Sequence, residues 1–137
     1  MDDRVRGALA SGLTCDITTT GRASGLPRRI EIWYFVVDSQ VYLTGTPGPC
    51  DWYANLLARP RFIFHVKQGA QADLPARAVP IVEPAERRRI MGVVIGYNQW
   101  FAEQDYDLDA WVVGSPLVLV EFAADTEAAG RRAHPGA

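Results

Sequence analysis

The sequence has few histidines and few cysteines, and this scarcity excludes the common kinds of metal site. Two histidines and two cysteines occur among 137 residues, and His134 lies in a polar stretch near the C-terminus. Only His65 is left, so a zinc site with His and Cys ligands at the usual spacing cannot be assembled, and we expect no bound metal. Cys15 and Cys50 do not form a CxxC pair and are expected to be reduced thiols of a cytoplasmic protein.

Motifs for phosphate-binding and dinucleotide-binding loops are also missing. The sequence contains neither GxxxxGK nor GxGxxG, and residues 21–25 read GxxSG instead of the GxSxG of a nucleophile elbow. These absences exclude metal hydrolases, P-loop enzymes and Rossmann dehydrogenases. Any redox chemistry must therefore depend on a different kind of cofactor site.

Long apolar runs and an excess of positive charge are absent too. The apolar runs at 32–37 and 117–120 have the length of strands, far short of a membrane span, and the polar residues 2–4 lead us to expect no signal peptide. A net charge of −2 gives no basic footprint for nucleic acid. With 48% apolar and 22% charged residues, the chain has the composition of one soluble domain with its own core.

The pattern along the chain is rich in β-strands. Asp51 is expected to be the N-cap of a helix over 52–58, and residues 97–113 are expected to be partly helical. We expect other helices over 2–11 and 84–96, and strands over 13–20, 28–37, 41–45, 61–67, 72–82 and 116–122. Six strands with few, short helices predict a mainly β fold, a small β-barrel with a helical flap. The expected domain covers residues 1–123, and residues 124–137 are expected to be a disordered tail.

One turn combines glycines with cationic side chains. Arg22, Arg28 and Arg29 lie within eight positions of one another, together with Ser24 and two glycines. Glycines let backbone N–H groups approach an anion, and the planar guanidinium fork matches phosphate or carboxylate. The alternative interpretation is an ordinary hairpin turn with solvated arginines.

Three further features have both a structural and a functional interpretation. The aromatic residues between 97 and 111 form either a core or dimer interface, or a lid over a pocket. His65 on its strand is either structural or a cofactor contact. The run Glu86 to Arg89 is expected to be a solvated helix face.

Two motifs, in the same order and at the same spacing, resemble the deazaflavin-dependent nitroreductase family of flavin/deazaflavin oxidoreductases. They are Thr18-Thr19-Thr20-Gly21-Arg22-x-Ser24-Gly25-x-Pro27-Arg28, followed by an Ile/Trp/Tyr strand, and Asp51-Trp52-Tyr53-x-Asn55-Leu56-x-x-x-Pro60. The resemblance extends from Leu13 to Phe122 and implies an FMN-binding-like split β-barrel with a groove for coenzyme F420, whose phosphate and glutamate tail are anionic.

The resemblance also implies roles for individual residues, although it leaves the catalytic proton donor unassigned. Those implied to bind the cofactor tail are Arg22, Ser24 and Arg28, and those implied to lie near its ring are Thr44, Gly45, Thr46 and Trp52. Those implied to face the substrate are Trp33, Tyr97, Trp100, Phe101 and Tyr106. The chain departs from the family at residues 46–50, Thr-Pro-Gly-Pro-Cys, where many members have a longer Ser-Lys-Gly-Gly loop whose lysine contacts an anion. FMN therefore stays an alternative cofactor.

The resemblance implies an F420-dependent reductase that transfers a hydride to a quinone, an enone or a nitro compound. One alternative is an FMN-binding reductase of the same fold. Another is a non-catalytic carrier of a deazaflavin, a haem or an apolar ligand. Related split barrels commonly pair, so a homodimer is expected, without a nucleic-acid partner or a membrane span.

Overall fold

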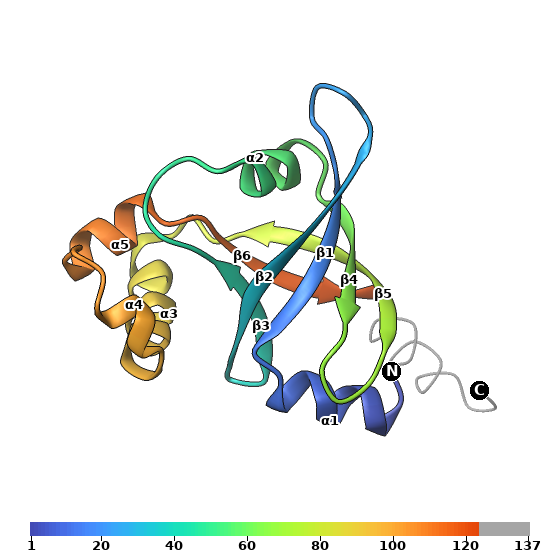
Figure 1. The fold of residues 1–137 in the computed structure, drawn as a ribbon. Helices are drawn as coiled ribbons and strands as arrows, with labels where there is room; N and C mark the ends of the chain where they lie inside the picture. Colours follow the sequence, from blue (N-terminus) through green and yellow to red (C-terminus); the bar gives the residue numbers. More distant parts are fainter. Residues whose placement is uncertain (124–137) are drawn as a thin grey trace, which may run out of the picture.

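A computed structural model gives the arrangement of residues 1–123 (Figure 1), and the expected tail, 124–137, lies outside the described residues. The elements in chain order are α1 (Asp3–Ser11), β1 (Thr14–Thr20), β2 (Pro27–Val37), β3 (Gln40–Thr44), α2 (Asp51–Ala58), β4 (Arg61–Val66), β5 (Ala72–Pro80), α3 (Pro84–Tyr97), α4 (Gln99–Ala102), α5 (Leu108–Gly114) and β6 (Leu117–Phe122). Each of the six expected strands is present, and each of its ends lies within two residues of the expected limit.

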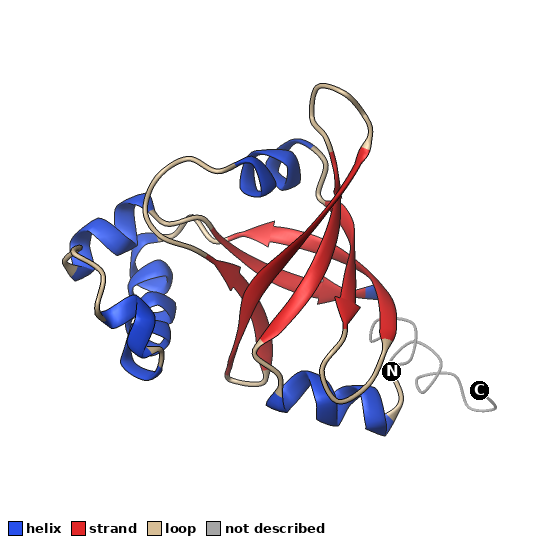
Figure 2. Ribbon diagram, viewed as in Figure 1, coloured by secondary structure: helices blue, strands red, loops and turns tan. Residues whose placement is uncertain are grey.

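The six strands close into an antiparallel barrel in the order β1-β2-β3-β6-β5-β4 (Figure 2). Side chains alternate between the two faces of each strand, so that one set fills the interior. Ile17, Leu43, Phe64 and Val118 of this set are fully buried. The predicted mainly β fold, a barrel with short helices, is confirmed.

Helix α1 covers one end of the barrel. Its N-cap is Asp2, whose carboxylate accepts a hydrogen bond of 2.8 Å from the backbone of Val5. The hydroxyl of Tyr34, on β2, donates to the carbonyl of Leu9 at 2.7 Å. A Cβ at Gly12 would lie 2.3 Å from that hydroxyl oxygen, which requires glycine where the helix joins β1.

A second hydrophobic core lies between the outer face of β2 and β3 and the helices α3, α4 and α5 (Figure 1). Phe35 and Tyr42 from the strands pack there with Ile90, Met91 and Trp111 from the helices. This arrangement confirms that the segment 97–113 is partly helical. Within the described residues, no helix has the length and apolarity needed to cross a membrane.

The hairpin of β1 and β2 extends beyond the barrel as an arm, residues 19–28. Strand β1 pairs with β2 along all of its seven residues, but its pairing with β4 covers only Asp16 to Thr18. The arm therefore leaves the barrel and lies beside α2 (Figure 1). The N-cap of α2 is Cys50 rather than Asp51, so the sequence-based assignment of this cap was wrong by one residue.

Candidate functional site

A cavity of about 440 Å³ lies between the arm and α2. We call it the arm pocket, and the residues that line it are Thr19, Gly21, Arg22, Ala23, Ser24, Arg28, Ile30, Asp51, Trp52 and Asn55. The arm pocket thus brings together four of the seven residues expected to bind a cofactor, from the two motifs that are far apart in the sequence.

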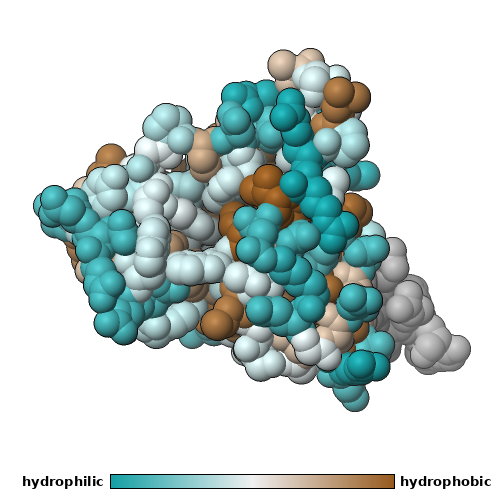
Figure 3. Space-filling view, viewed as in Figure 1, coloured by the Kyte–Doolittle hydropathy of each residue, from teal (hydrophilic) through white to brown (hydrophobic). Residues whose placement is uncertain are grey.

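Strand alternation explains how the arm pocket gets its apolar wall. Arg28 and Ile30 belong to the face of β2 that continues into the barrel core with Tyr34. Inside the barrel this face is covered, whereas on the arm it is open, and Ile30 is 38% exposed. Figure 3 shows a hydrophobic patch over β2 below α2, surrounded by hydrophilic side chains.

The arginines of the turn differ in what they contact. The Nη1 of Arg22 donates a hydrogen bond of 2.9 Å to Asn55 Oδ1, and its Nη2 lies 3.3 Å from Asp51 Oδ1. Its backbone N–H also donates to Asn55 Oδ1, at 3.0 Å. Arg22 therefore fastens the arm to α2. The guanidinium of Arg28 has no hydrogen-bond or ion-pair partner among residues 1–123, which makes it the available cation of the arm pocket.

The turn at the tip of the arm is tightly bonded. The amide of Gly21 donates to the carbonyl of Leu26 at 2.8 Å, and Gly25 adopts a φ of +71°. Ser24 Oγ accepts from the amide of Leu26 at 3.1 Å. Ser24 can therefore still donate its own hydroxyl proton to an anion in the arm pocket.

The loop that begins with the residues implied to lie near a cofactor ring is hydrogen-bonded to the segment between α5 and β6. Thr44 is buried, and its hydroxyl donates to the carbonyl of Pro116 at 2.6 Å. The amide of Gly48 donates to the carbonyl of Gly114 at 3.0 Å. Thr44, Gly45 and Thr46 do not line the arm pocket. Any contact that they make with a ring would therefore lie outside this pocket.

The residues expected to face a substrate form one connected cluster of rings. Trp33 is 37% exposed and meets the edge of Trp100, with ring centroids 5.4 Å apart. Phe101 is 3% exposed and stacks on Trp111 at 5.1 Å, so it supports the cluster from within the core. Tyr97 contacts Phe35, which contacts Phe101, and Tyr106 contacts Trp111. The aromatic cluster is our name for Trp33, Tyr97, Trp100, Phe101, Tyr106 and Trp111.

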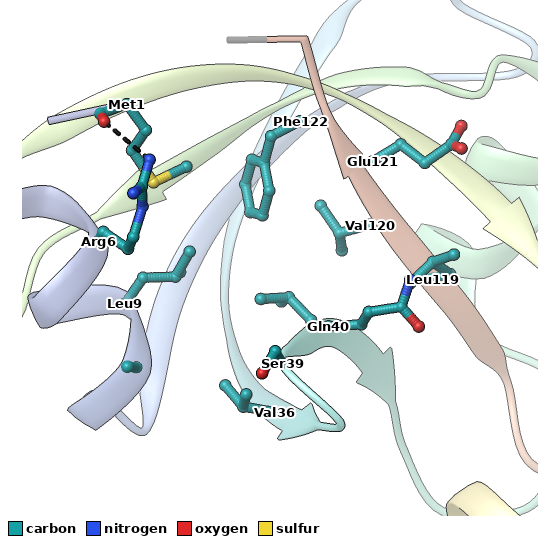
Figure 4. Close-up of a pocket in the computed structure, with 12 residues that line it drawn as sticks. Met1, Arg6, Leu9, Val36, Ser39, Gln40, Leu119, Val120, Glu121 and Phe122 are labelled. Atoms are coloured by element: carbon teal, nitrogen blue, oxygen red, sulfur yellow. Dashed lines mark hydrogen bonds between the residues drawn. The ribbon is translucent and has the colours of Figure 1, made fainter. Parts of the chain in front are cut away.

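Two other cavities lack the expected residues. One, of about 520 Å³, lies at the far end of the barrel between α1 and β6 (Figure 4). Its wall is largely apolar, and the Arg6 side chain there donates to the carbonyl of Met1 at 3.1 Å. The other, of about 900 Å³, is an open groove on the outer face of β4 and β5. No group of His, Cys, Asp or Glu among residues 1–123 is arranged to hold a metal ion.

His65 has a structural place in the barrel wall. Its Nε2 lies 2.7 Å from Thr18 Oγ1 and its Nδ1 lies 2.7 Å from Asp73 Oδ1, which connects β1, β4 and β5. The hydrogen bond with His65 is the main cause that lowers the pKa of Asp73. The hydrogen-bonded residues Thr18, His65 and Asp73 lie on the outer face of the barrel, and none of them lines the arm pocket.

One functional candidate was missed in the sequence. Arg87 was expected on a solvated helix face, but it is only 9% exposed, whereas Arg88 and Arg89 are exposed as expected. Its position, three and four residues before the buried Ile90 and Met91, is the helical spacing of a buried face, and this periodicity was the available signal.

Comparisons with known proteins identify the family and the fold. A family model described as F420H(2)-dependent quinone reductase matches residues 6–113. No curated protein sequence matches the chain.

Several solved structures share the fold. A protein of Bacteroides thetaiotaomicron, proposed to confer 5-nitroimidazole resistance, has a TM-score of 0.68 and 14% identity, over 90% of this chain and 80% of that one. An F420 reductase gives a TM-score of 0.61 at 14% identity, over 90% of this chain and 96% of that one. An FAD-binding protein of Mesorhizobium loti gives 0.59 at 16% identity, over 89% and 88%. These similarities confirm the expected split β-barrel.

Proposed function

Because the chain belongs to the F420H(2)-dependent quinone reductase family, we propose that it reduces a quinone, or a similar electron-poor small molecule, with reduced F420. Membership in this family makes the protein an oxidoreductase that uses F420, which confirms the expected family and cofactor. The acceptor and the residues that hold each partner are the proposed part.

The observation that carries the proposal is the combination of an available cation and an apolar wall in one pocket. Arg28 has no partner among the described residues, and it lies in the arm pocket with Ile30 and Trp52. F420 has an anionic phosphate and tail joined to a planar ring. Arg28 and Ser24 would bind the anionic part, while Arg22 fixes the arm against α2. Ile30 and Trp52 would then cover apolar surface of the ring end.

Bound F420 supplies the hydride, so the tasks left to the chain are binding, orientation and exclusion of water. The loop 45–50 lies between the arm pocket and the helices, and its attachment to Gly114 holds it in place. In the aromatic cluster, Trp33 and Trp100 present exposed ring surface on which a flat acceptor can stack. Partial burial raises the pKa of Tyr97 above its ordinary 10.0.

A titration of the purified chain with F420, and separately with FMN, tests the cofactor site. Trp52 lines the arm pocket, so bound F420 should quench tryptophan fluorescence in a saturable way. A Trp52→Phe variant should lose part of this quenching and keep its affinity, because an aromatic ring is retained. Preference for FMN would indicate the flavin-binding alternative. Binding of neither cofactor would contradict the proposal.

Turnover tests the acceptor. The chain, mixed with reduced F420, should oxidise it in the presence of a soluble quinone, and a nitroaromatic compound and an enone serve as comparisons. Faster oxidation with the quinone supports the proposal. Tight F420 binding without turnover of any acceptor would instead support a non-catalytic carrier.

We also propose that two copies pair, as sequence analysis predicts. The exposed apolar side chains Val82 and Val113, 77% and 85% exposed, are candidates for burial in such a contact. Light scattering after size-exclusion chromatography decides this, and a monomeric mass at high protein concentration would refute it. The single domain over residues 1–123 and the cytoplasmic location stay predictions.

A further inference from the structure

The loop 45–50, whose first residues the family resemblance implies to lie near the cofactor ring, depends on a short segment of the chain about seventy residues later. Two hydrogen bonds link the loop and the end of β3 to residues 114–116, from Thr44 to the Pro116 carbonyl at 2.6 Å and from Gly48 to the Gly114 carbonyl at 3.0 Å, and the Thr44 hydroxyl also lies 3.4 Å from Met91 Sδ. This segment joins α5 to β6. The position of the loop is therefore set by whatever holds residues 114–116.

Arg87 holds that segment. Its Nε donates to the carbonyl of Val112 at 2.7 Å, its Nη1 to the carbonyl of Ile81 at 2.7 Å, and its Nη2 to the carbonyl of Ser115. No carboxylate forms an ion pair with Arg87 in the described part of the chain. All three acceptors are backbone carbonyls. The Arg87 guanidinium therefore donates its hydrogen bonds to the main chain and to no other side chain.

Physical chemistry explains why an arginine is suited to this place. The last carbonyls of a helix such as α5 have no partner within the helix and carry partial negative charge, which a cation stabilises. A buried charge without hydrogen bonds is costly, so Arg87 is tolerated because its N–H groups are satisfied. Three carbonyls in different directions match the planar fork of a guanidinium, whereas the ammonium of lysine is a single point.

The packing between the two segments is tight enough to transmit a displacement. A Cβ on Gly114 would lie 3.1 Å from Pro47 Cβ, and a Cβ on Gly45 would lie 3.6 Å from Pro116 Cγ. Close-packed interiors pass such shifts on to their neighbours, because no void is available to absorb them. A change in residues 112–116 is therefore expected to move the loop 45–50.

We propose that Arg87 is a positioning residue for the reaction, which fixes residues 112–116 and through them places the loop 45–50 against the cofactor ring. This inference rests on the proposed function for the identity of the ligand. Arg87 itself lines neither the arm pocket nor the exposed part of the aromatic cluster. Its effect is on the ring end, and the anionic tail held by Arg28 is outside its reach.

The first test needs no cofactor. Hydrogen exchange in the cofactor-free Arg87→Lys variant should be faster at the Gly48 amide, which donates to the Gly114 carbonyl, with the arm unchanged. Arg88→Lys is the matched control, since Arg88 is the next residue of the same helix and pairs on the surface with Asp109. We expect wild-type exchange rates in the control. Unchanged protection of the loop in a folded Arg87→Lys variant would overturn the proposal.

The second test separates the ring from the tail. The dissociation constants of F420 and of the deazaflavin riboside that lacks phosphate and tail should both rise by the same factor in Arg87→Lys, because a displaced loop would disturb the ring that the two ligands share, and neither ligand loses a bond to Arg87 itself. An unchanged affinity for both ligands would refute the positioning role. If wild-type protein binds neither ligand, the proposed function fails, and the exchange experiment alone decides the inference about Arg87.

A second variant approaches the same contact from the other side. Gly114→Ala adds a methyl group against Pro47 and leaves Arg87 intact. It should raise the same two dissociation constants and the same exchange rates, and it carries the test if Arg87→Lys does not fold. Normal ring affinity together with normal exchange in Gly114→Ala would contradict the proposed route from residues 112–116 to the loop.

Discussion

Replacement of Arg28 by alanine gives the sharpest test of the arm pocket, because its neighbour in the sequence is a ready control. Arg28 and Arg29 are adjacent on β2 and so point to opposite faces. Arg28 lines the arm pocket, whereas Arg29 donates from its Nε to Asp16 Oδ2 at 3.0 Å on the outer face. Both substitutions remove one positive charge from nearly the same place, and only Arg28→Ala removes it from the pocket.

The magnitude follows from the kind of contact that is lost. A hydrogen bond between a guanidinium and an anionic oxygen contributes about 1.5–3 kcal/mol, which corresponds to a change in the dissociation constant of roughly 10-fold to 150-fold. Arg28 is exposed to solvent, which screens its charge, so the lower end of this range applies. We therefore expect Arg28→Ala to weaken F420 binding about tenfold, and Arg28→Lys to weaken it less.

The assay is a fluorescence titration with F420 at two salt concentrations, for wild type, Arg28→Ala and Arg29→Ala. The loss in Arg28→Ala should shrink at high salt, because screening already weakens the wild-type contact. Affinity for the deazaflavin riboside without a tail should not change in this variant. Equal losses in Arg28→Ala and Arg29→Ala would refute the reasoning, since a general effect of charge would then explain both.

Three further predictions concern stability and thiol chemistry. The hydrogen bond from Lys67 is the main cause that lowers the pKa of Asp16 below its ordinary 3.8, so this pair stabilises the fold above that pH and ceases to do so as the pH falls through the lowered value. Lys67→Met should therefore lower the unfolding free energy at neutral pH more than at a pH below 3.8, as measured by urea denaturation. Burial raises the pKa of Cys15 to about 12, so a thiol reagent should label Cys50 first in the native protein and both residues only in denaturant; rapid labelling of Cys15 would contradict its burial. Phe64 is fully buried, so Phe64→Ala should leave a cavity and lower the free energy of unfolding by about 3–5 kcal/mol without changing the topology. Thermal or chemical unfolding measures this decrease.

Local signals in the sequence were sufficient for most of the fold. In the strand expected over 61–67, the alternation of apolar residues puts Phe62 and Phe64 on one face, and both are buried. The strands expected over 28–37 and 41–45 leave only three residues between them, and the tight turn there has Asp38 and Ser39 at φ values of +52° and +63°. Such features are decided by near neighbours along the chain, which is why sequence periodicity and turn composition indicate them.

The parts that could not be predicted depend on contacts between distant segments. The burial of Arg87 requires carbonyls at residues 81, 112 and 115, and nothing in its own helix shows where these lie. The hydrogen bond from the Thr44 hydroxyl to the carbonyl of Pro116 also joins distant segments, and nothing near Thr44 in the sequence indicates it. Phe101 was expected to face a substrate, and its stacking on Trp111 places it in the core. In each case the partner is fixed only when the helices pack on the barrel.

The shared face of β2 has a consequence for how relatives of this chain can differ in length. The same row of alternate side chains that begins with Arg28 in the arm pocket continues into the barrel core at Tyr34. One residue inserted or deleted between them would turn either the anion contact or the core side chain to the wrong face. Within the strand, an insertion keeps both side chains on their faces only if it adds an even number of residues, whereas residues 21–26 at the tip, which belong to neither strand, are free of this constraint.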